Sequence, residues 1–320
     1  MKCYALSVTV VVAAILAAAC SKPAEPGPIT LGVPWYPLDG PLIPAKMTMV
    51  TAWDVPSNPL TDKTLDDSKL SKEIKSGYRL FTNTPVEAKR LVPGKMACNN
   101  CHLNAGQRNR ALPLVGIAGQ FPEYNRRAGR LITLADRIVD CFLRSENATG
   151  RGEEGEPPSP TDREVLALQA YITWLSRGYD VGANPQWRNK NTIPNETLVP
   201  VDKLDAKRGE ELYLDRCTNC HGVDGQGVTV GDKRPGPLWG PDSWNDGAGA
   251  ARIYTLAGII RHMMPYLDPG SLTDEEAQHV AAFINSKPRP AYPFKDRDYL
   301  TEALSVDSVY YPRRQPVSQL

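Results

Sequence analysis

The sequence predicts a mostly α-helical protein built from two similar helical domains, and three observations support this. A length of 320 residues suits two domains of ordinary size, and 41% hydrophobic with 23% charged residues is a globular composition. One pattern occurs twice: a short amphipathic helix, a C-x-x-C-H pentapeptide, a loop and a closing helix. The stretches between these units are rich in Pro, Gly and polar residues and predict long loops.

The chain begins with the pattern of an export signal. Lys2 precedes an apolar run that ends in three alanines before Cys20, which predicts a signal over residues 1–19. The run resembles a bacterial lipobox, in which Cys20 would be acylated after cleavage. Ordinary cleavage at Ala19, an uncleaved signal anchor and a buried segment are the alternatives. All of these except the buried segment place the protein in the periplasm, and we expect it there. It could be anchored to the membrane by a lipid on Cys20.

The remaining chain divides at turn-rich stretches. The first helix of each unit is expected over 74–81 and 206–214. The predicted segments are a linker and wrapping segment at 20–70, a first domain at 71–182, a linker at 183–200, a second domain at 201–287, and an extended C-terminal strap over the surface at 288–320.

Each unit closes with a helix whose start and buried face can be located. Thr161 and Thr273 each stand three residues before a glutamate, which fits a capping box. Tyr171 and Phe283 follow ten residues after these caps, within apolar stripes. Such stripes are typical of a helical core, so both aromatic rings are expected to be buried.

The pentapeptides predict covalent haem. C-x-x-C-H is the attachment site of c-type haem, in which two thiols bond the haem and the adjacent histidine binds its iron. A structural zinc site would instead need cysteine pairs close together in the chain. We therefore expect two cytochrome c-like domains, each with one covalently bound haem c. The attachment and proximal residues are Cys98, Cys101 and His102 in the first domain, and Cys217, Cys220 and His221 in the second.

The second axial ligand of the first iron can be sought by elimination. Between His102 and Lys190 there is no His, Met or Lys, and the one cysteine left over is Cys141. An unused thiol is a liability in an oxidising compartment, so Cys141 is favoured as distal ligand or reactive thiol. It could also be a buried small hydrophobe. The iron would then be five-coordinate or bound by an upstream methionine, namely Met47, Met49 or Met96.

A methionine is the favoured ligand in the second domain. Met264 precedes a proline and lies shortly before the closing helix, a position typical of the methionine ligand in small cytochromes c. Met263 and His262 are the next candidates; Lys233 is another, and His279 is expected to be a surface or core histidine. Thioether ligation raises a haem potential and thiolate ligation lowers it. The first haem should therefore have the lower potential.

Arginines concentrate around Cys141. Residues 108–151 hold eight arginines, no lysine and four acids, a local excess of +4 in a chain of net charge +1. Arginine binds oxyanions through paired hydrogen bonds, and its charge would favour a thiolate at Cys141. If 131–144 is helical, Arg137, Cys141 and Ser145 share one face. Haem propionates or solvent could take several of these arginines, and two or three are expected to serve one substrate. The eight are Arg108, Arg110, Arg126, Arg127, Arg130, Arg137, Arg144 and Arg151.

Across roughly residues 70–300 the sequence resembles the dihaem thiosulfate dehydrogenases, the tetrathionate-forming c-type cytochromes. The resemblance implies an enzyme that joins two thiosulfates into tetrathionate, in some relatives reversibly. It implies that Cys141 is the distal ligand of the active-site haem and that Arg127, Arg137 and Ser145 line the pocket. Some relatives have a lysine where this chain has Met263, so a Lys/Met ligand exchange is excluded there. The segments that carry the resemblance are Asn83–Pro85, Cys98–Gly106, Arg137–Ser145, Tyr171–Gly178, Cys217–Gly222, Met263–Pro265 and Arg289–Pro290.

The expected partners are thiosulfate, tetrathionate and an external electron acceptor such as a small cytochrome c or a high-potential redox protein. The net charge of +1 gives no reason to expect nucleic acid as a partner. Contact with a membrane is expected only through a lipid anchor at Cys20. Two alternatives remain: an electron-transfer cytochrome without its own substrate, or a haem subunit of a sulfur-oxidising complex. A dihaem peroxidase is disfavoured, because histidines that could act on peroxide are missing around the first haem.

Overall fold

The computed structural model describes residues 58–150, 155–182, 184–230 and 234–312. The predicted export signal, Cys20 and most of the 20–70 segment lie outside these ranges, as do Met47, Met49, Arg151 and Lys233. Within the described ranges, no helix is both long enough and apolar enough to cross a membrane.

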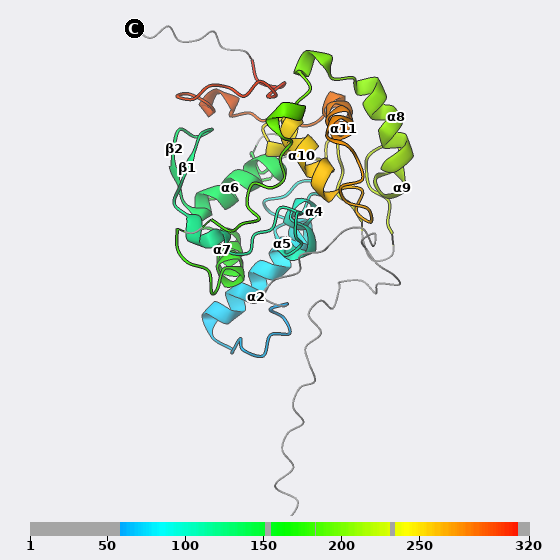
Figure 1. Ribbon diagram of the computed structural model, residues 1–320. Helices are drawn as coiled ribbons and strands as arrows, with labels where there is room; N and C mark the ends of the chain where they lie inside the picture. Colours follow the sequence, from blue (N-terminus) through cyan, green and yellow to red (C-terminus); the bar gives the residue numbers. More distant parts are fainter. Residues whose placement is uncertain (1–57, 151–154, 183, 231–233, 313–320) are drawn as a thin grey trace, which may run out of the picture. The chain divides into compact units, whose positions relative to one another are not determined.

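The first domain is helical, with one small hairpin. Its closing helix α7 packs against α2 and α6 (Figure 1). Strands β1 and β2 pair antiparallel, with Tyr124 opposite Leu131. The elements are α2 (Lys69–Thr82), α3 (Thr84–Glu87), α4 (Cys98–Cys101), α5 (Leu103–Gly106), η1 (Ile117–Gln120), β1 (Glu123–Asn125), β2 (Arg130–Ile132), α6 (Leu134–Ser145) and α7 (Arg163–Leu175).

The second domain repeats the arrangement. Its closing helix α11 packs against α8 and α10. The elements are η2 (Asn195–Thr197), η3 (Val201–Lys203), α8 (Ala206–Arg216), α9 (Thr218–His221), η4 (Gly249–Ala251), α10 (Ile253–Met263) and α11 (Asp274–Ser286), followed by η5 (Lys295–Arg297) in the C-terminal segment. The predicted mostly α-helical fold with two similar domains is confirmed.

One of the two predicted capping boxes is wrong. At α11 the box forms: the Thr273 hydroxyl accepts from the Glu276 amide at 3.2 Å, and the Glu276 carboxylate accepts from the Thr273 amide at 2.8 Å. At α7 the N-cap is Asp162 rather than Thr161, and its side chain makes no capping hydrogen bond. The reason is competition, because the Asp162 carboxylate is bound by Arg90 at 3.2 Å.

The helix that carries Cys141 begins later than residue 131, the start considered from the sequence. Leu131 belongs to the hairpin, and α6 begins at Leu134. Thr133 is its N-cap and forms a capping box with Asp136, which fixes the start. The face expected from the helical spacing is retained, because Arg137, Cys141 and Ser145 all lie within α6.

In both domains the first and the closing helix cross at a glycine. A Cβ on Gly77 would overlap the Ala167 carbonyl and stand 2.8 Å from the Tyr171 Cβ. In the second domain a Cβ on Gly209 would overlap the His279 carbonyl and stand 2.9 Å from the Phe283 Cβ. The predicted burial of both aromatic rings is confirmed, with Tyr171 at 0% and Phe283 at 5% exposure. The helical repeat therefore extends to the packing contact.

Replacing Gly209 by Ala should destabilise the second domain. The new methyl group would meet backbone atoms of α11, which no rotamer change can move, so we expect a loss of roughly 2 kcal/mol in the free energy of unfolding. Gly249→Ala is the matched control, because nothing lies within 4 Å of its added Cβ. Urea unfolding of the haem-loaded protein measures both. Equal stability of the two variants would show that α8 and α11 can separate without cost.

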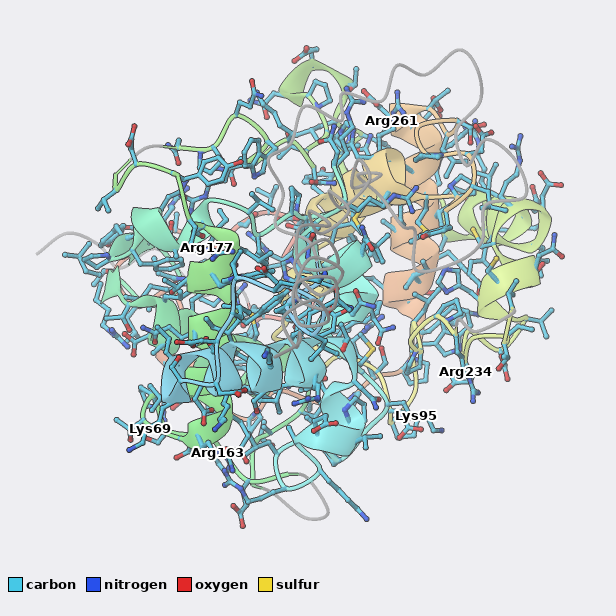
Figure 2. All side chains as sticks on the ribbon, turned by 90° about the horizontal axis from the view of Figure 1, so that it is seen from below. Lys69, Lys95, Arg163, Arg177, Arg234 and Arg261 are labelled. Atoms are coloured by element: carbon cyan, nitrogen blue, oxygen red, sulfur yellow. The ribbon has the colours of Figure 1, made fainter. Side chains whose placement is uncertain are left out.

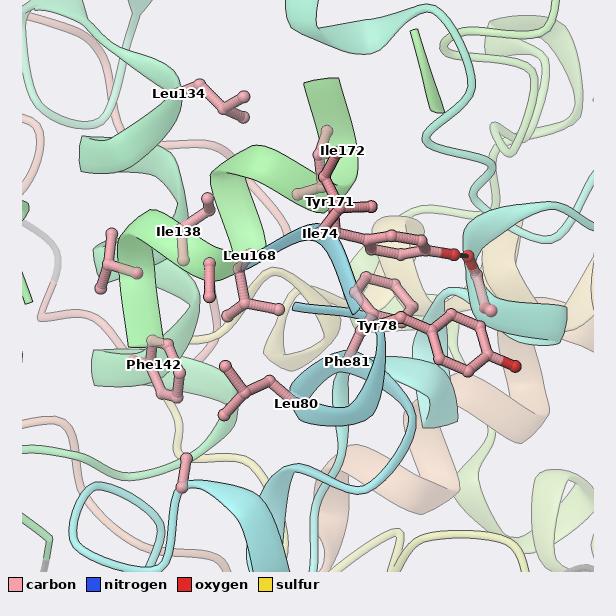
Figure 3. Close-up of a cluster of buried hydrophobic side chains, with 14 of the residues drawn as sticks. Ile74, Tyr78, Leu80, Phe81, Leu134, Ile138, Phe142, Leu168, Tyr171 and Ile172 are labelled. Atoms are coloured by element: carbon pink, nitrogen blue, oxygen red, sulfur yellow. Dashed lines mark hydrogen bonds between the residues drawn. The ribbon is translucent and has the colours of Figure 1, made fainter. Parts of the chain in front are cut away.

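The apolar core of the first domain lies between α2, α6 and α7. Figure 3 shows Ile74, Tyr78 and Phe81 from α2 meeting Leu168 and Tyr171 from α7, with α6 on the same cluster. A second cluster forms around α10 and α11.

The haem-attachment turn of the first domain also reaches the second core. Met96 is 2% exposed and belongs to the second cluster, and Cys101 packs against it. The Arg108 guanidinium lies 4.1 Å from the centre of the Tyr266 ring and donates to the Tyr266 carbonyl at 2.9 Å. The two domains therefore share apolar and polar contacts beside the first attachment turn.

The C-terminal segment does more than lie over the surface. Apart from η5 its described part has no helix or strand. Its backbone binds the second domain, where the Pro288 and Pro290 carbonyls accept from the Gly240 and Asp246 amides. Asp298 is only 4% exposed, so the predicted strap also contributes a buried charge to the interior.

Candidate active site and haem attachment

The first C-x-x-C-H motif forms a tight turn that displays its thiols. Cys98 and Cys101 delimit α4, and both are free and partly exposed. The Cys98 amide donates to the Thr84 hydroxyl at 3.1 Å, and the Asn100 side chain accepts from the Ala97 amide at 2.7 Å. These bonds from side chains hold the turn, and the Thr84 hydroxyl also donates to the Cys98 sulfur at 3.5 Å. Neither sulfur is in a disulfide.

His102 has the chemistry of a proximal iron ligand. Its Nδ1 lies 2.6 Å from the Leu112 carbonyl, so Nδ1 carries the proton and the Nε2 lone pair is free for a metal. Leu112 has a left-handed backbone, with φ of 50°, at the residue that presents this carbonyl. Burial lowers the pKa of His102 to about 4, against the opposing effect of the Leu112 hydrogen bond. The imidazole is therefore neutral at ordinary pH, as an iron ligand must be.

Cys141 lies close to the same group of side chains. A negative charge at Cys141 would raise the pKa of the Cys98 thiol. The positive charge of Arg137 acts to lower the pKa of both the Cys141 thiol and the His102 imidazole. Arg127 also acts on Cys141. The structure thus gathers the predicted distal ligand, the proximal ligand and two predicted pocket arginines. Ser145 stands one helical turn beyond Cys141, at the end of α6.

The arginines alone do not hold Cys141 as a thiolate. Burial raises the pKa of the Cys141 thiol and outweighs the opposite effect of Arg137 and Arg127. The expected direction of the arginine effect is therefore present, but burial has the larger effect on the pKa of this thiol. If Cys141 binds the haem iron as predicted, coordination would deprotonate the thiol outright.

Three other arginines of the basic stretch have partners away from Cys141. Arg108 is bound to Tyr266, Arg126 pairs with Glu302 at 3.4 Å, and Arg130 pairs with Asp136 at 3.6 Å. Arg137 keeps 45% of its side-chain exposure, so a dissolved anion can reach it. Arg127 and Arg137 remain the predicted substrate pair.

Two acids near Cys141 have surroundings that the sequence does not indicate. Asp140 contacts three arginines of the basic stretch. Glu146 is 4% exposed, and burial raises its pKa well above the ordinary value. Its ionised form would raise the pKa of the Cys98 and Cys101 thiols. The position of Glu146 in the sequence is unusual for an acid, because it directly follows the last residue of α6, where the helix dipole disfavours an anion.

The second attachment turn has a similar donor set. Cys217 caps α8 and Cys220 lies in α9, and both thiols are free and partly exposed. Burial lowers the pKa of His221 to about 4, so this imidazole is neutral as well. Within the described residues its buried Nδ1 has no hydrogen-bond partner. A neutral, buried histidine beside two free thiols fits covalent haem.

Burial separates the candidates for the second axial ligand of this iron. Met263 is 2% exposed, whereas Met264 at the end of α10 is only partly buried and packs against the second apolar cluster. His262 lies 3.0 Å from the Thr192 carbonyl. His279 is buried in α11 and accepts from the Asp205 amide at 3.0 Å, as expected of a core histidine. These contacts favour Met264.

The donor sets of both turns fit haem c, with Cys141 and Met264 as the predicted second axial ligands. Two helical domains, each with such a turn between a first and a closing helix, define a dihaem c-type cytochrome.

Comparisons with known proteins give the same class. Residues 88–181 match the family model of the SoxA/TsdA cytochrome c domain, and residues 204–284 match that of cytochrome c oxidase, cbb3-type, subunit III. The thiosulfate dehydrogenase of Allochromatium vinosum is 42% identical over 71% of this chain and 82% of the relative. That of Stutzerimonas stutzeri is 36% identical over 73% of each chain. The chain belongs to the thiosulfate dehydrogenase family and carries two haem c groups in two cytochrome c domains.

A solved structure agrees. It is the thiosulfate dehydrogenase (TsdBA) from Marichromatium purpuratum, which matches with a TM-score of 0.67 and 35% identity over 75% of this chain. The chain spans about half the length of that protein, since 50% of it is covered.

Proposed function

We propose that this enzyme oxidises thiosulfate, joins two molecules of it into tetrathionate and passes two electrons to an external cytochrome. Family membership supports the reaction class. The observation that carries the assignment to a site is that Arg137 and Arg127 both approach Asp140, the residue directly before Cys141, at 3.3 and 3.9 Å.

The arginines serve to bring two dianions together. Two thiosulfates repel each other, and guanidinium groups offset this repulsion while binding sulfonate oxygens through paired hydrogen bonds. Arg127 is 16% and Arg137 45% exposed, so both are shielded enough for their charge to count and open enough for an anion to arrive.

Cys141 supplies the sulfur on which the new bond is built. Its thiolate bonds the sulfane sulfur of one thiosulfate, which releases two electrons and leaves a cysteine S-thiosulfonate. The second thiosulfate attacks that sulfane sulfur, the bond to Cys141 breaks, and tetrathionate leaves with the Cys141 thiolate restored. When bound, the two haem c groups would take up one electron each.

The haem-loaded protein tests this function directly. Addition of thiosulfate should reduce its haems, and steady-state assays should show tetrathionate formation with an added cytochrome acceptor, and tetrathionate reduction in the reverse assay. Haems that stay oxidised in excess thiosulfate would instead identify an electron-transfer cytochrome without its own substrate.

The acceptor and the location are part of the proposal. Val223, Val228 and Val230 follow His221 and are exposed, which suits docking of a small redox protein beside the second haem. The signal-like segment 1–19 supports export to the periplasm, with acylation at Cys20. Fractionation of cells, followed by mass spectrometry of the mature N-terminus, tests the location and the lipid.

A further inference from the structure

Asp140 lies among three arginines beside the active cysteine. One of its carboxylate oxygens is 3.3 Å from Arg137 Nη1 and 3.9 Å from Arg127 Nη1, and the other is bound by Arg144 Nε. The two arginines that the proposed function assigns to thiosulfate therefore share one carboxylate. Because Asp140 directly precedes Cys141 in α6, this carboxylate is tied to the helix that carries the reacting sulfur.

Arg144 is bound in turn by the C-terminal segment. It is 5% exposed, and its Nη1 and Nη2 donate to the two carboxylate oxygens of Asp298, both at 2.8 Å. Its guanidinium also lies 4.1 Å from the centre of the Tyr292 ring. The Tyr311 hydroxyl donates to Asp298 at 2.5 Å. Paired hydrogen bonds between buried ions fix both position and orientation, unlike an exposed ion pair.

Basic residues at the outer surface differ from Arg144 in their exposure to solvent. Lys69, Lys95 and Arg163 lie at the rim of the molecule in Figure 2, and the Arg163 side chain is 79% exposed. Such groups are solvated and contribute little. Arg144 and Asp298 are buried instead, so the loss of either would leave an unpaired charge inside the protein.

Arg127, one of the two proposed substrate arginines, shares contacts with Arg144 and with the C-terminal segment. Arg127 and Arg144 both donate to the Gly247 carbonyl, at 3.0 and 3.1 Å. The Arg127 carbonyl accepts from the Tyr299 amide, the residue after Asp298, at 2.8 Å. The segment that holds Arg144 thus also holds the backbone of Arg127.

We propose that Asp298 is a positioning residue for the active site: through Arg144 it fixes Asp140, which sets the places of Arg127 and Arg137 around Cys141 for thiosulfate. This inference rests on the proposed function and adds the C-terminal segment to its site. Three guanidinium groups around one carboxylate repel each other. When Arg144 loses its second partner it competes more strongly for Asp140, and the two substrate arginines move away from the geometry that binds the anion.

Asp298→Asn tests the inference in the haem-loaded enzyme. We expect KM for thiosulfate to rise at least about tenfold, with a smaller change in kcat and both haems attached. Asp298→Glu should recover part of the loss. In the Arg137→Gln background, Asp298→Asn should have a much smaller effect than alone, because both changes act on one group. The electron paramagnetic resonance signal of the Cys141-bound haem should shift in Asp298→Asn, because the charge beside its sulfur has moved.

Lys295→Met is the matched control. Lys295 pairs with Asp246 and so anchors the same C-terminal segment, but it has no contact with Asp140. We expect KM and the resonance signal of this variant to be those of the parent enzyme. An Asp298→Asn enzyme with unchanged KM, or a Lys295→Met enzyme with an equal rise, would overturn the positioning role while thiosulfate oxidation by the parent stands. A parent enzyme without thiosulfate activity would overturn both proposals.

Discussion

Replacing Cys141 by Gly should abolish thiosulfate oxidation while both haems stay attached. Haem attachment depends on Cys98, Cys101, Cys217 and Cys220, none of which the substitution changes. The proposed reaction loses the sulfur on which the new bond is built, so we expect kcat to fall at least about a thousandfold. Steady-state assay, together with the absorbance of the denatured haem c, measures activity and haem content on one preparation.

Cys141→Ala separates the loss of sulfur from a disturbance of the helix. Glycine inside α6 costs about 1 kcal/mol of helix stability relative to alanine, so a stability effect would differ between the two variants. The loss of the sulfur would affect both equally. The pocket arginines and Asp140 remain in place, so weak binding of thiosulfate should persist. Retention of normal turnover in either variant would rule out a covalent role for Cys141.

The sequence predicted the parts of this protein that follow a local or periodic rule. Both attachment turns are contiguous motifs, and the repeated helices have the helical period with Gly77 and Gly209 at matching places. Cys141 could be favoured by elimination because alternatives are sparse over a long stretch. These inferences need no knowledge of which distant segments meet.

The rest depends on contacts between segments far apart in the chain. Asp298 meets Arg144 only in the folded protein, and no spacing rule connects an acid in an irregular segment with a helix in the first domain. Asp162, the N-cap of α7, makes no capping hydrogen bond for a similar reason, since Arg90, far from it in sequence, binds its carboxylate. Leu131 fits both a strand and a helix pattern, and its pairing with Tyr124 decides between them.

The second large effect is expected at Met264. Axial ligands set haem potentials over a wide range, and a thioether raises the potential. Met264→Ala should therefore lower the midpoint potential of the second haem by more than about 100 mV, and electrons from the first haem would no longer leave readily to a high-potential acceptor. Redox titration of the two haems by absorbance measures the shift, and only the higher midpoint should move.

Met263→Ala is the matched comparison, because the two methionines are adjacent and differ in burial. Met263 is 2% exposed, so its truncation should cost about 2–5 kcal/mol of unfolding free energy and leave the potential of the second haem in place. Met264 is only partly buried, so its truncation should cost less stability and change the potential more. The opposite pair of results would make Met263 the iron ligand and would require α10 to end before it. Because Arg108 of the first domain binds Tyr266, two residues beyond Met264, the position of this predicted ligand also depends on contact between the two domains.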